Sequence, residues 1–192
     1  MAEYADFLSV VRPEVPNAPK QTMVTAIKLA LRELCERSHI WTYTMDPAVV
    51  YPGNQEVDLE FPSNAELVSV QNVDMDSLPL SPDSDFSVSL DGKIITLSSP
   101  VKEDKSVTIK LALRPSYDAS SIEQWLVSDY LMTVAHGALA ILFAQSGREW
   151  FNPNVVAYHT KKFSAGVANA TIRACNGGKV NRRLRVKPHT FA

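Results

Sequence analysis

The hydrophobic pattern of this chain changes its period twice, and all the strand-like segments lie between the two changes. Over residues 42–118, apolar residues alternate with polar ones, which is typical of short strands with one buried face. Before and after that range, apolar residues recur every three or four positions, as they do along a helix. Strands that are grouped together, rather than interleaved with helices, predict an α+β fold and argue against a parallel α/β sheet.

The strongest helical pattern covers residues 120–145, where the apolar stripe is too wide for an exposed helix. Ser120 and Glu123 have the spacing of a capping box, in which each side chain accepts a hydrogen bond from a backbone N–H of the first turn. Gly147 is placed to adopt the left-handed conformation that often ends a helix. The most apolar part, residues 134–144, is too short to span a bilayer. We therefore expect this helix to be the centre of a globular core.

Another long helix is expected near the N-terminus, after a proline-rich connector. Residues 4–11 have the pattern of a short amphipathic helix, and residues 12–19 contain three prolines, which favour an extended connector. Asn17 is placed to cap the next helix, with Pro19 in its first turn, where the missing N–H does no harm. The helical pattern then continues to about His39.

A third long helix is predicted from Asn152, as its cap, to about Asn176, where two glycines follow. Gly166, Ala170 and Ala174 recur every four residues in it, which allows another helix to approach closely. The side chains expected on its inner face are Val156, His159, Phe163, Val167, Ala170 and Ala174.

The alternating segments predict five or six antiparallel strands in a small sandwich or curled sheet. Their strongest hairpin signal is Asp91-Gly92, because a type I′ turn needs positive φ at both central positions. The expected α+β fold is a bundle of about three long helices, with the β insertion between the first two and an extended C-terminal tail. The corresponding domains are a helical domain (residues 1–41 and 119–178), a β-rich insertion (42–118) and a docking tail (179–192).

The charges are unevenly distributed along the chain, although the net charge is only −2. Residues 150–192 contain eight basic residues and no acidic one, whereas residues 1–149 contain eleven basic and twenty-one acidic residues. The β insertion alone has thirteen acidic and five basic residues. A chain divided in this way can meet a neighbour or partner head to tail through its charges.

The sequence contains no recognisable catalytic or cofactor motif. The serine-hydrolase pattern G-x-S-x-G, the zinc-protease pattern H-E-x-x-H and the Walker A loop are all missing. The histidines, at positions 39, 136, 159 and 189, are far apart, and none has a cysteine or carboxylate at metal-ligand spacing. We interpret His136 as a satisfied core residue and expect no catalytic residue, no cofactor and no metal.

Four carboxylates, Asp74, Asp76, Asp83 and Asp85, lie within twelve residues of the β insertion. This density is also found in calcium-binding loops, but the twelve-residue pattern of those loops, with its central glycine and final glutamate, is missing. We therefore favour a polar loop between strands.

The basic C-terminal tail is the most informative local feature. It could be a solvated end, a nonspecific nucleic-acid-binding arm, or an arm that becomes ordered on a partner. Val180, Leu184, Val186 and Phe191 provide apolar anchors among the charges, which a pure phosphate-binding arm does not need. Such an arm can add as a strand to the sheet edge of a partner. The residues by themselves leave these three interpretations open.

Taken end to end, the chain resembles the head-to-tail connector (adaptor) proteins of tailed bacteriophages, including the tail tubular A type of short-tailed phages. The first similar patch is residues 15–41, with VPNAP followed by ALRELCERS and a tryptophan. The second is LALRPS at residues 111–116, and the third runs through residues 136–163 with HGALA, WFNP and a phenylalanine. Asn17-Ala18 replaces the Gly-Cys that is common in the family, and Leu34 stands where Phe is usual.

The resemblance implies a virion protein that forms a ring of twelve copies below the portal, joins the head to the tail and leaves a channel for DNA passage during ejection. It implies portal and tail or nozzle proteins as partners, transient contact with DNA, no membrane, and synthesis in the host cytoplasm. The tail residues expected to dock on the portal are Val180, Arg182, Arg183, Leu184, Arg185, Val186, Lys187 and Phe191. Those expected to contact a neighbouring subunit or the tail are Asp74, Asp76, Asp83, Asp85, Lys161, Lys162 and Arg173.

Two functions of other classes are kept as alternatives. A pair of carboxylates in this chain could cleave peptidoglycan, because the separation of such a pair decides its chemistry and a sequence does not give it. The basic tail could instead make the protein a DNA-binding module, whose affinity would fall steeply as salt rises.

Overall fold

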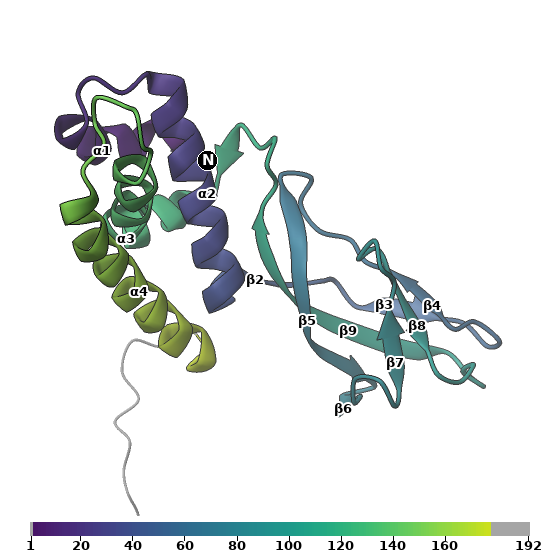
Figure 1. Cartoon of the computed structure of the whole chain (residues 1–192). Coiled ribbons are helices and arrows are strands. Elements are labelled where there is room, and N and C mark those ends of the chain that lie inside the picture. Colours follow the sequence, from purple (N-terminus) through teal and green to yellow (C-terminus); the bar gives the residue numbers. More distant parts are fainter. Residues whose placement is uncertain (1, 178–192) are drawn as a thin grey trace, which may run out of the picture.

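The computed structural model describes residues 2–177, which form a helical lobe and a β lobe (Figure 1). The helix α2 lies on the side of the helical lobe that faces the β lobe. The helical lobe contains the 3-10 helix η1 (Tyr4–Phe7) and the helices α1 (Leu8–Glu14), α2 (Lys20–Ser38), α3 (Gln124–Phe143) and α4 (Pro153–Cys175).

The helix α3 is the centre of the helical lobe, because it contacts α1, α2, α4 and η1. Its length and composition would allow it to cross a membrane, so the apolar stretch is longer than the sequence pattern suggested. However, 56% of its apolar window is buried inside the protein, as in the core helix of a folded domain.

Close approach of the helices depends on two glycines. A Cβ on Gly137 of α3 would lie 2.8 Å from both Ala30 of α2 and Phe163 of α4, so the three helices meet at this point. A Cβ on Gly166 of α4 would lie 2.9 Å from the Cβ of Thr133 of α3. The small-residue spacing therefore correctly predicted a helix contact.

The β lobe consists of two antiparallel sheets. One sheet has the order β2-β9-β5-β6, with β3 also paired to β9, and the other has the order β4-β8-β7. The strands of the first sheet are β2 (Thr42–Thr44), β3 (Ala48–Val50), β5 (Ala65–Met75), β6 (Leu78–Pro79) and β9 (Lys105–Pro115). Those of the second are β4 (Glu56–Asp58), β7 (Phe86–Val88) and β8 (Ile94–Leu97).

The strand β9 is the central strand of the larger sheet, since β2, β3 and β5 all pair with it. Its alternate residues Val107, Ile109, Leu111 and Leu113 are almost fully buried, as the alternation predicted. The long ladder between β5 and β9 contains two register shifts, between Leu67 and Ser69 and between Val70 and Asn72. Such bulges bend and twist a strand pair locally.

The α+β class, the antiparallel β insertion between α2 and α3, and the two long C-terminal helices agree with the sequence prediction. The insertion has eight strands rather than five or six, because the sequence pattern missed β2, β3 and β6, which are two or three residues long. The exact domain boundaries stay a prediction, and the tail proposed for residues 179–192 lies outside the described residues.

Both caps predicted for α2 and α3 are wrong. Helix α3 begins after Glu123, whose side chain makes no capping hydrogen bond. Ser120 precedes the strand β10 (Ser121–Ile122), which pairs with β1 (Ala2–Glu3) and so holds this segment extended. Helix α2 begins after Pro19 rather than after Asn17. Burial of neighbouring Val15 and Ala18 fixes that connector through packing, not through a polar cap.

The ends of two other helices also differ from the prediction. Helix α1 continues to Glu14 and includes Pro13, because the burial of Val11 and Val15 holds this turn against the core. Gly147 has the predicted positive φ, 77°, but it lies in the loop that follows the end of α3 at Phe143. Asn152 is at the N-cap position of α4 as predicted, although its side chain makes no cap hydrogen bond.

The type I′ turn predicted at Asp91-Gly92 is also wrong. The strands β7 and β8 do form a hairpin, but of these two residues only Gly92 has a positive φ, 68°. The hydroxyl of Ser89 accepts hydrogen bonds from the backbone N–H of Lys93 and Ile94, and these contacts hold a wider loop. Two successive positive φ values occur instead at Asp76 (50°) and Ser77 (69°), in the turn between β5 and β6.

Candidate functional site

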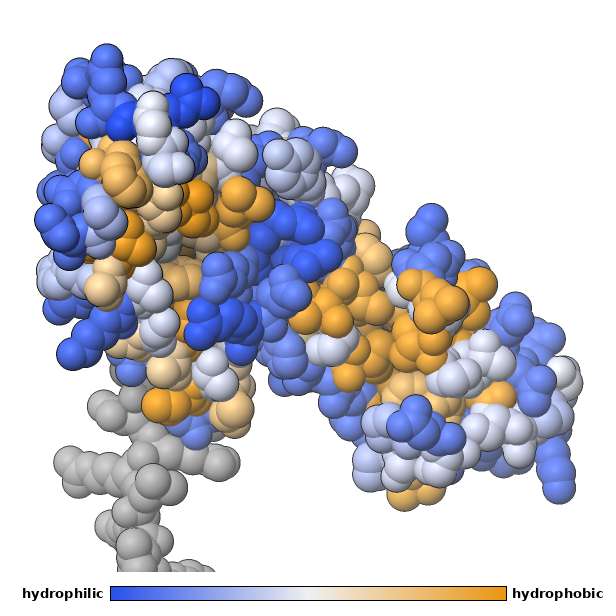
Figure 2. All heavy atoms as spheres, in the orientation of Figure 1, coloured by the Kyte–Doolittle hydropathy of each residue, from blue (hydrophilic) through white to orange (hydrophobic). Residues whose placement is uncertain are grey.

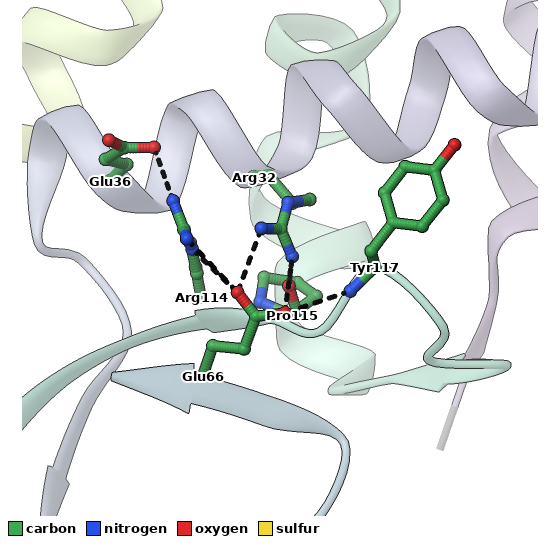
Figure 3. A network of polar contacts seen from close by, with 6 residues as sticks. All are labelled: Arg32, Glu36, Glu66, Arg114, Pro115 and Tyr117. Atoms are coloured by element: carbon green, nitrogen blue, oxygen red, sulfur yellow. Dashed lines mark hydrogen bonds and ion pairs between the residues drawn. The ribbon is translucent and has the colours of Figure 1, made fainter. Parts of the chain in front are cut away.

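The two lobes are joined by a network of charged side chains between α2 and the sheet, which we call the waist (Figure 3). Arg32 of α2 donates to both oxygens of Glu66 on β5, at 2.9 and 3.2 Å. The same guanidinium donates to the carbonyl of Pro115, at the end of β9. Arg114 bridges Glu66 at 3.1 Å and Glu36 of α2 at 2.9 Å. Bidentate contacts of this kind restrict geometry as well as adding energy.

Glu66 is the acceptor at the centre of the waist. Its hydrogen bond from Arg32 lowers the pKa of its carboxyl, and a backbone hydrogen bond from Tyr117 and the charge of Arg114 act in the same direction. The side chain of Arg32 is 15% exposed and that of Glu66 is 38% exposed, so the pair is partly screened by solvent. The waist thus fixes the two lobes relative to each other but offers no open reactive group.

Next to the waist, Lys28 of α2 makes a further contact between the two lobes. The ammonium of Lys28 donates to the carbonyl of Tyr117 at 3.0 Å and lies 4.9 Å from the ring centroid of Tyr4. A cation over an aromatic face gains about 0.5–1 kcal/mol at exposed sites. Together with the β1–β10 pair, this contact ties the N-terminus to the chain that leaves the β lobe.

Two of the four histidines meet in space, which their separation in sequence did not suggest. The Nδ1 atoms of His136 on α3 and His159 on α4 lie 3.0 Å apart, with the ring of Phe143 packed 5.4 Å from His159. Burial lowers the pKa of both side chains, and for His159 the neighbouring His136 lowers it further. A pair of neutral rings, one donating and one accepting, fits these contacts, so His136 is satisfied by a histidine.

The described residues contain no group of three histidine, cysteine or acidic side chains that could hold a metal ion. Three of the four aspartates of the β insertion instead accept hydrogen bonds from other groups of the protein. Asp76 accepts from the backbone N–H of Ser106 at 3.0 Å and pairs with Lys105 at 3.0 Å. Asp85 accepts from the backbone of Ser81 at 2.8 Å, and Asp74 accepts from Asn72. Asp76, Asp83 and Asp85 lie between strands, as the polar-loop interpretation expected, whereas Asp74 belongs to the strand β5.

The basic residues predicted to form contacts lie on α4, in the other lobe (Figure 1). Lys161 and Lys162 are exposed, and Lys162 lies 5.7 Å from the ring centroid of Tyr158. Arg173, in contrast, pairs with Asp129 of α3 at 2.6 Å. The acidic and basic sets are therefore not brought together within one copy, and Arg173 already has a partner.

The C-terminal residues predicted to dock on a portal, from Val180 to Phe191, lie outside the described residues.

An apolar groove of about 650 Å³ was missed by the sequence pattern. It lies between β5 and the β7–β8 loop, in the lobe where Figure 2 shows a broad apolar patch. Its apolar lining includes Phe61, Leu67, Val68, Val70, Val88 and Leu90. An alternating pattern identifies the apolar face of a strand, but it does not show whether other parts of the protein cover that face.

No model of a known protein family matches this chain, and no curated protein is found to be similar to it in sequence.

Proposed function

We propose that this protein is a structural virion protein that forms the head-to-tail adaptor ring of a tailed bacteriophage. In this role it has no enzymatic activity, binds the portal on one side and a tail or nozzle protein on the other, and surrounds a channel for DNA. Twelve copies are the number that the resemblance to phage connector proteins implies.

The observation that carries this proposal is the separation of charge between the two lobes. The β insertion has thirteen acidic and five basic residues, while Lys161 and Lys162 are exposed on the helical lobe and have no ion pair among the described residues. Contacts between unlike surfaces of identical copies add subunits in one direction, and they form a ring when the rotation closes. An acidic lobe near a channel would also repel DNA phosphates and prevent them from adhering.

The positions of the resembling patches give further support. Ala30 of the first patch, Gly137 of the third and Phe163 at the end of the third meet where three helices cross. Arg32 of the first patch contacts Pro115 of the second in the waist. The patches are thus parts of one packing arrangement, as would be expected if they were inherited together.

Mass photometry of the full-length chain, alone and mixed with a portal ring, tests the proposal. A ring-sized increase in mass on the portal is expected. A chain truncated after Gly178 tests the role of the tail, because loss of the increase would show that residues 179–192 are needed for the ring to form on the portal. No increase with either chain would contradict the adaptor role. Peptidoglycan clearing or salt-sensitive binding to random duplex would then favour the enzymatic or DNA-binding alternative.

A further inference from the structure

The strand β5 has one open edge. Its other edge pairs with β9 from Ala65 to Met75. On the open side, β6 pairs only with Asp74 and Met75, and Leu80 adds one hydrogen bond to Val73. Among the described residues, no strand pairs with this side of residues 65–72. An open strand edge presents backbone donors and acceptors to any extended segment that can lie beside it.

The apolar groove runs beside this open edge. Leu67 and Val68 of β5 line one wall, and Val88 and Leu90 line the other. Leu90 is fully exposed, and the side chain of Leu67 lies next to Gly92 of the hairpin loop. Exposed apolar side chains next to unpaired backbone form a surface that suits an extended segment with apolar residues on one face.

This chain contains a segment of that kind outside the described residues. In an extended conformation, Val180, Arg182, Leu184 and Val186 would share one face, on which Arg182 is the only charged residue. The opposite face would carry four positive charges, at Lys179, Arg183, Arg185 and Lys187. The segment from residue 179 to 192 has five basic residues and no acidic one, and the β insertion has thirteen acidic residues against five basic ones.

We propose that residues 179–192 of one copy add as a strand to the open edge of β5 in a neighbouring copy, with Leu184 and Val186 in the groove. A neighbour supplies the groove because α4 ends in the helical lobe and the groove lies in the β lobe (Figure 1).

This contact specifies how neighbouring copies of the proposed ring would be joined. It rests on the proposed function only because it requires a second copy. The tail and the groove are different surfaces of one chain, so each copy both gives and receives a strand, and copies add in one direction. The portal contact predicted for the same tail would compete with this one. A portal would therefore have to displace the tail from its neighbour.

Crosslinking of the full-length chain tests the proposal directly. A photoreactive benzoylphenylalanine replaces Leu184, and unlabelled chains are mixed with ¹⁵N-labelled chains before irradiation. Crosslinks between unlabelled and labelled chains are expected, at residues 66–70 or 88–93. Crosslinks to other regions, crosslinks within single copies alone, or no crosslinks at concentrations where the chain self-associates would overturn it.

Substitutions in the groove give an independent readout. Leu90→Asp places a charge in the groove at a fully exposed position, so the fold is expected to tolerate it. It should weaken self-association in sedimentation velocity by about tenfold, because a charge buried against apolar residues is costly. Leu78→Asp is the matched control, since Leu78 is 69% exposed and lies outside the groove. Equal effects of the two substitutions would contradict the proposal.

The same variant separates this inference from the proposed function. If Leu90→Asp self-associates normally but the wild type still forms a ring-sized mass on the portal, the edge contact is wrong and the adaptor role stands. If self-association depends on Leu90 but neither chain binds a portal, the edge contact stands and the adaptor role is wrong.

Discussion

At the scale of single residues, the helical lobe depends on positions where two helices nearly touch. Gly166 is one of them, because any Cβ there would meet Thr133 of the neighbouring helix. Alanine is the better helix former by about 1 kcal/mol, so propensity alone would predict that Gly166→Ala stabilises the protein. The packing predicts the opposite sign.

We expect Gly166→Ala to lower the free energy of unfolding by about 1–2 kcal/mol, because overpacking a tight contact outweighs the gain in helix propensity. Urea denaturation of the purified protein measures this change. The control is the double variant with Thr133→Ala, which removes the methyl and hydroxyl of Thr133, the two atoms nearest to the added Cβ, and should recover most of the loss. A stabilised single variant would show that the helices can separate without cost.

The histidine pair gives the helical lobe a dependence on pH. Burial lowers the pKa of both His136 and His159 in the folded state, so the unfolded chain binds protons more readily. Stability is therefore full above the ordinary histidine pKa of about 6.5 and is lost as the pH falls below it. Glu14 acts in the opposite direction and raises both pKa values, whereas Lys162 lowers that of His136.

Thermal unfolding between pH 7.5 and pH 5 checks this expectation. The wild type should lose stability as the pH falls through the histidine range, and His136→Gln with His159→Gln should remove much of that loss. His39→Gln is a matched control, because His39 lies at the end of α2, away from the pair. An identical pH profile for the wild type and the double variant would contradict the role assigned to the pair.

At the scale of elements, the turn between β5 and β6 shows a conflict between residue type and backbone. Asp76 and Ser77 both have positive φ, a conformation that glycine adopts at the lowest cost. Asp76 compensates through its hydrogen bond from Ser106 and its pair with Lys105. Among the described residues, the Ser77 side chain makes no hydrogen bond or ion pair of this kind, so its strain is not offset locally.

We expect Ser77→Gly to raise the free energy of unfolding by about 0.5–1 kcal/mol, since it relieves the left-handed conformation. Ser87→Gly, on the exposed face of β7, should lower it by a similar amount because glycine weakens a strand interior. Denaturation of both variants by urea tests the two signs together. A loss of stability in Ser77→Gly would mean that the turn is not strained.

The waist is the element-level contact that joins the lobes. Glu66→Gln should lower the free energy of unfolding by about 1–2 kcal/mol, because two arginines then lose their charged acceptor while solvent screens part of the effect. The comparison is Glu33→Gln, whose exposed pair with Arg37 is worth about 0.3–0.5 kcal/mol. A double-mutant cycle with Arg32→Gln isolates the coupling, and additive effects would contradict it.

At the scale of the whole molecule, the exposed Lys161 and Lys162 and the acidic β insertion belong to different lobes. Lys161 and Lys162 are exposed on α4, and the acidic residues are concentrated in the β insertion. Within one copy the structure does not bring them together. Their complementarity can therefore act only between copies, or between this protein and a partner.

We expect Lys161→Glu with Lys162→Glu to weaken self-association by about tenfold at low salt and to have a smaller effect at high salt, because counterions screen exposed charges. Sedimentation velocity at two salt concentrations measures both effects. The control is Arg12→Glu with Lys20→Glu, which makes the same charge change elsewhere on the helical lobe. Equal effects of the two double substitutions would show that net charge, rather than a specific surface, is responsible.

The sequence by itself determined the α+β class, the order of the elements and the inner faces of the helices. These depend on the period of apolar residues, which is a local property of the chain. It also indicated the close approach at Gly166, because small residues four positions apart lie on one face of a helix. It predicted the buried alternation of β9 for the same reason.

Only the tertiary structure decided the helix starts, the turn types, the histidine pair, the waist and the open edge of β5. Pairing of β10 with β1 overrode the capping signal at Ser120, and contacts between α3 and α4 joined two histidines from distant parts of the sequence. Whether an apolar strand residue is covered depends on which strands lie beside it. Packing between distant segments decides such features, and no local pattern in the chain records it.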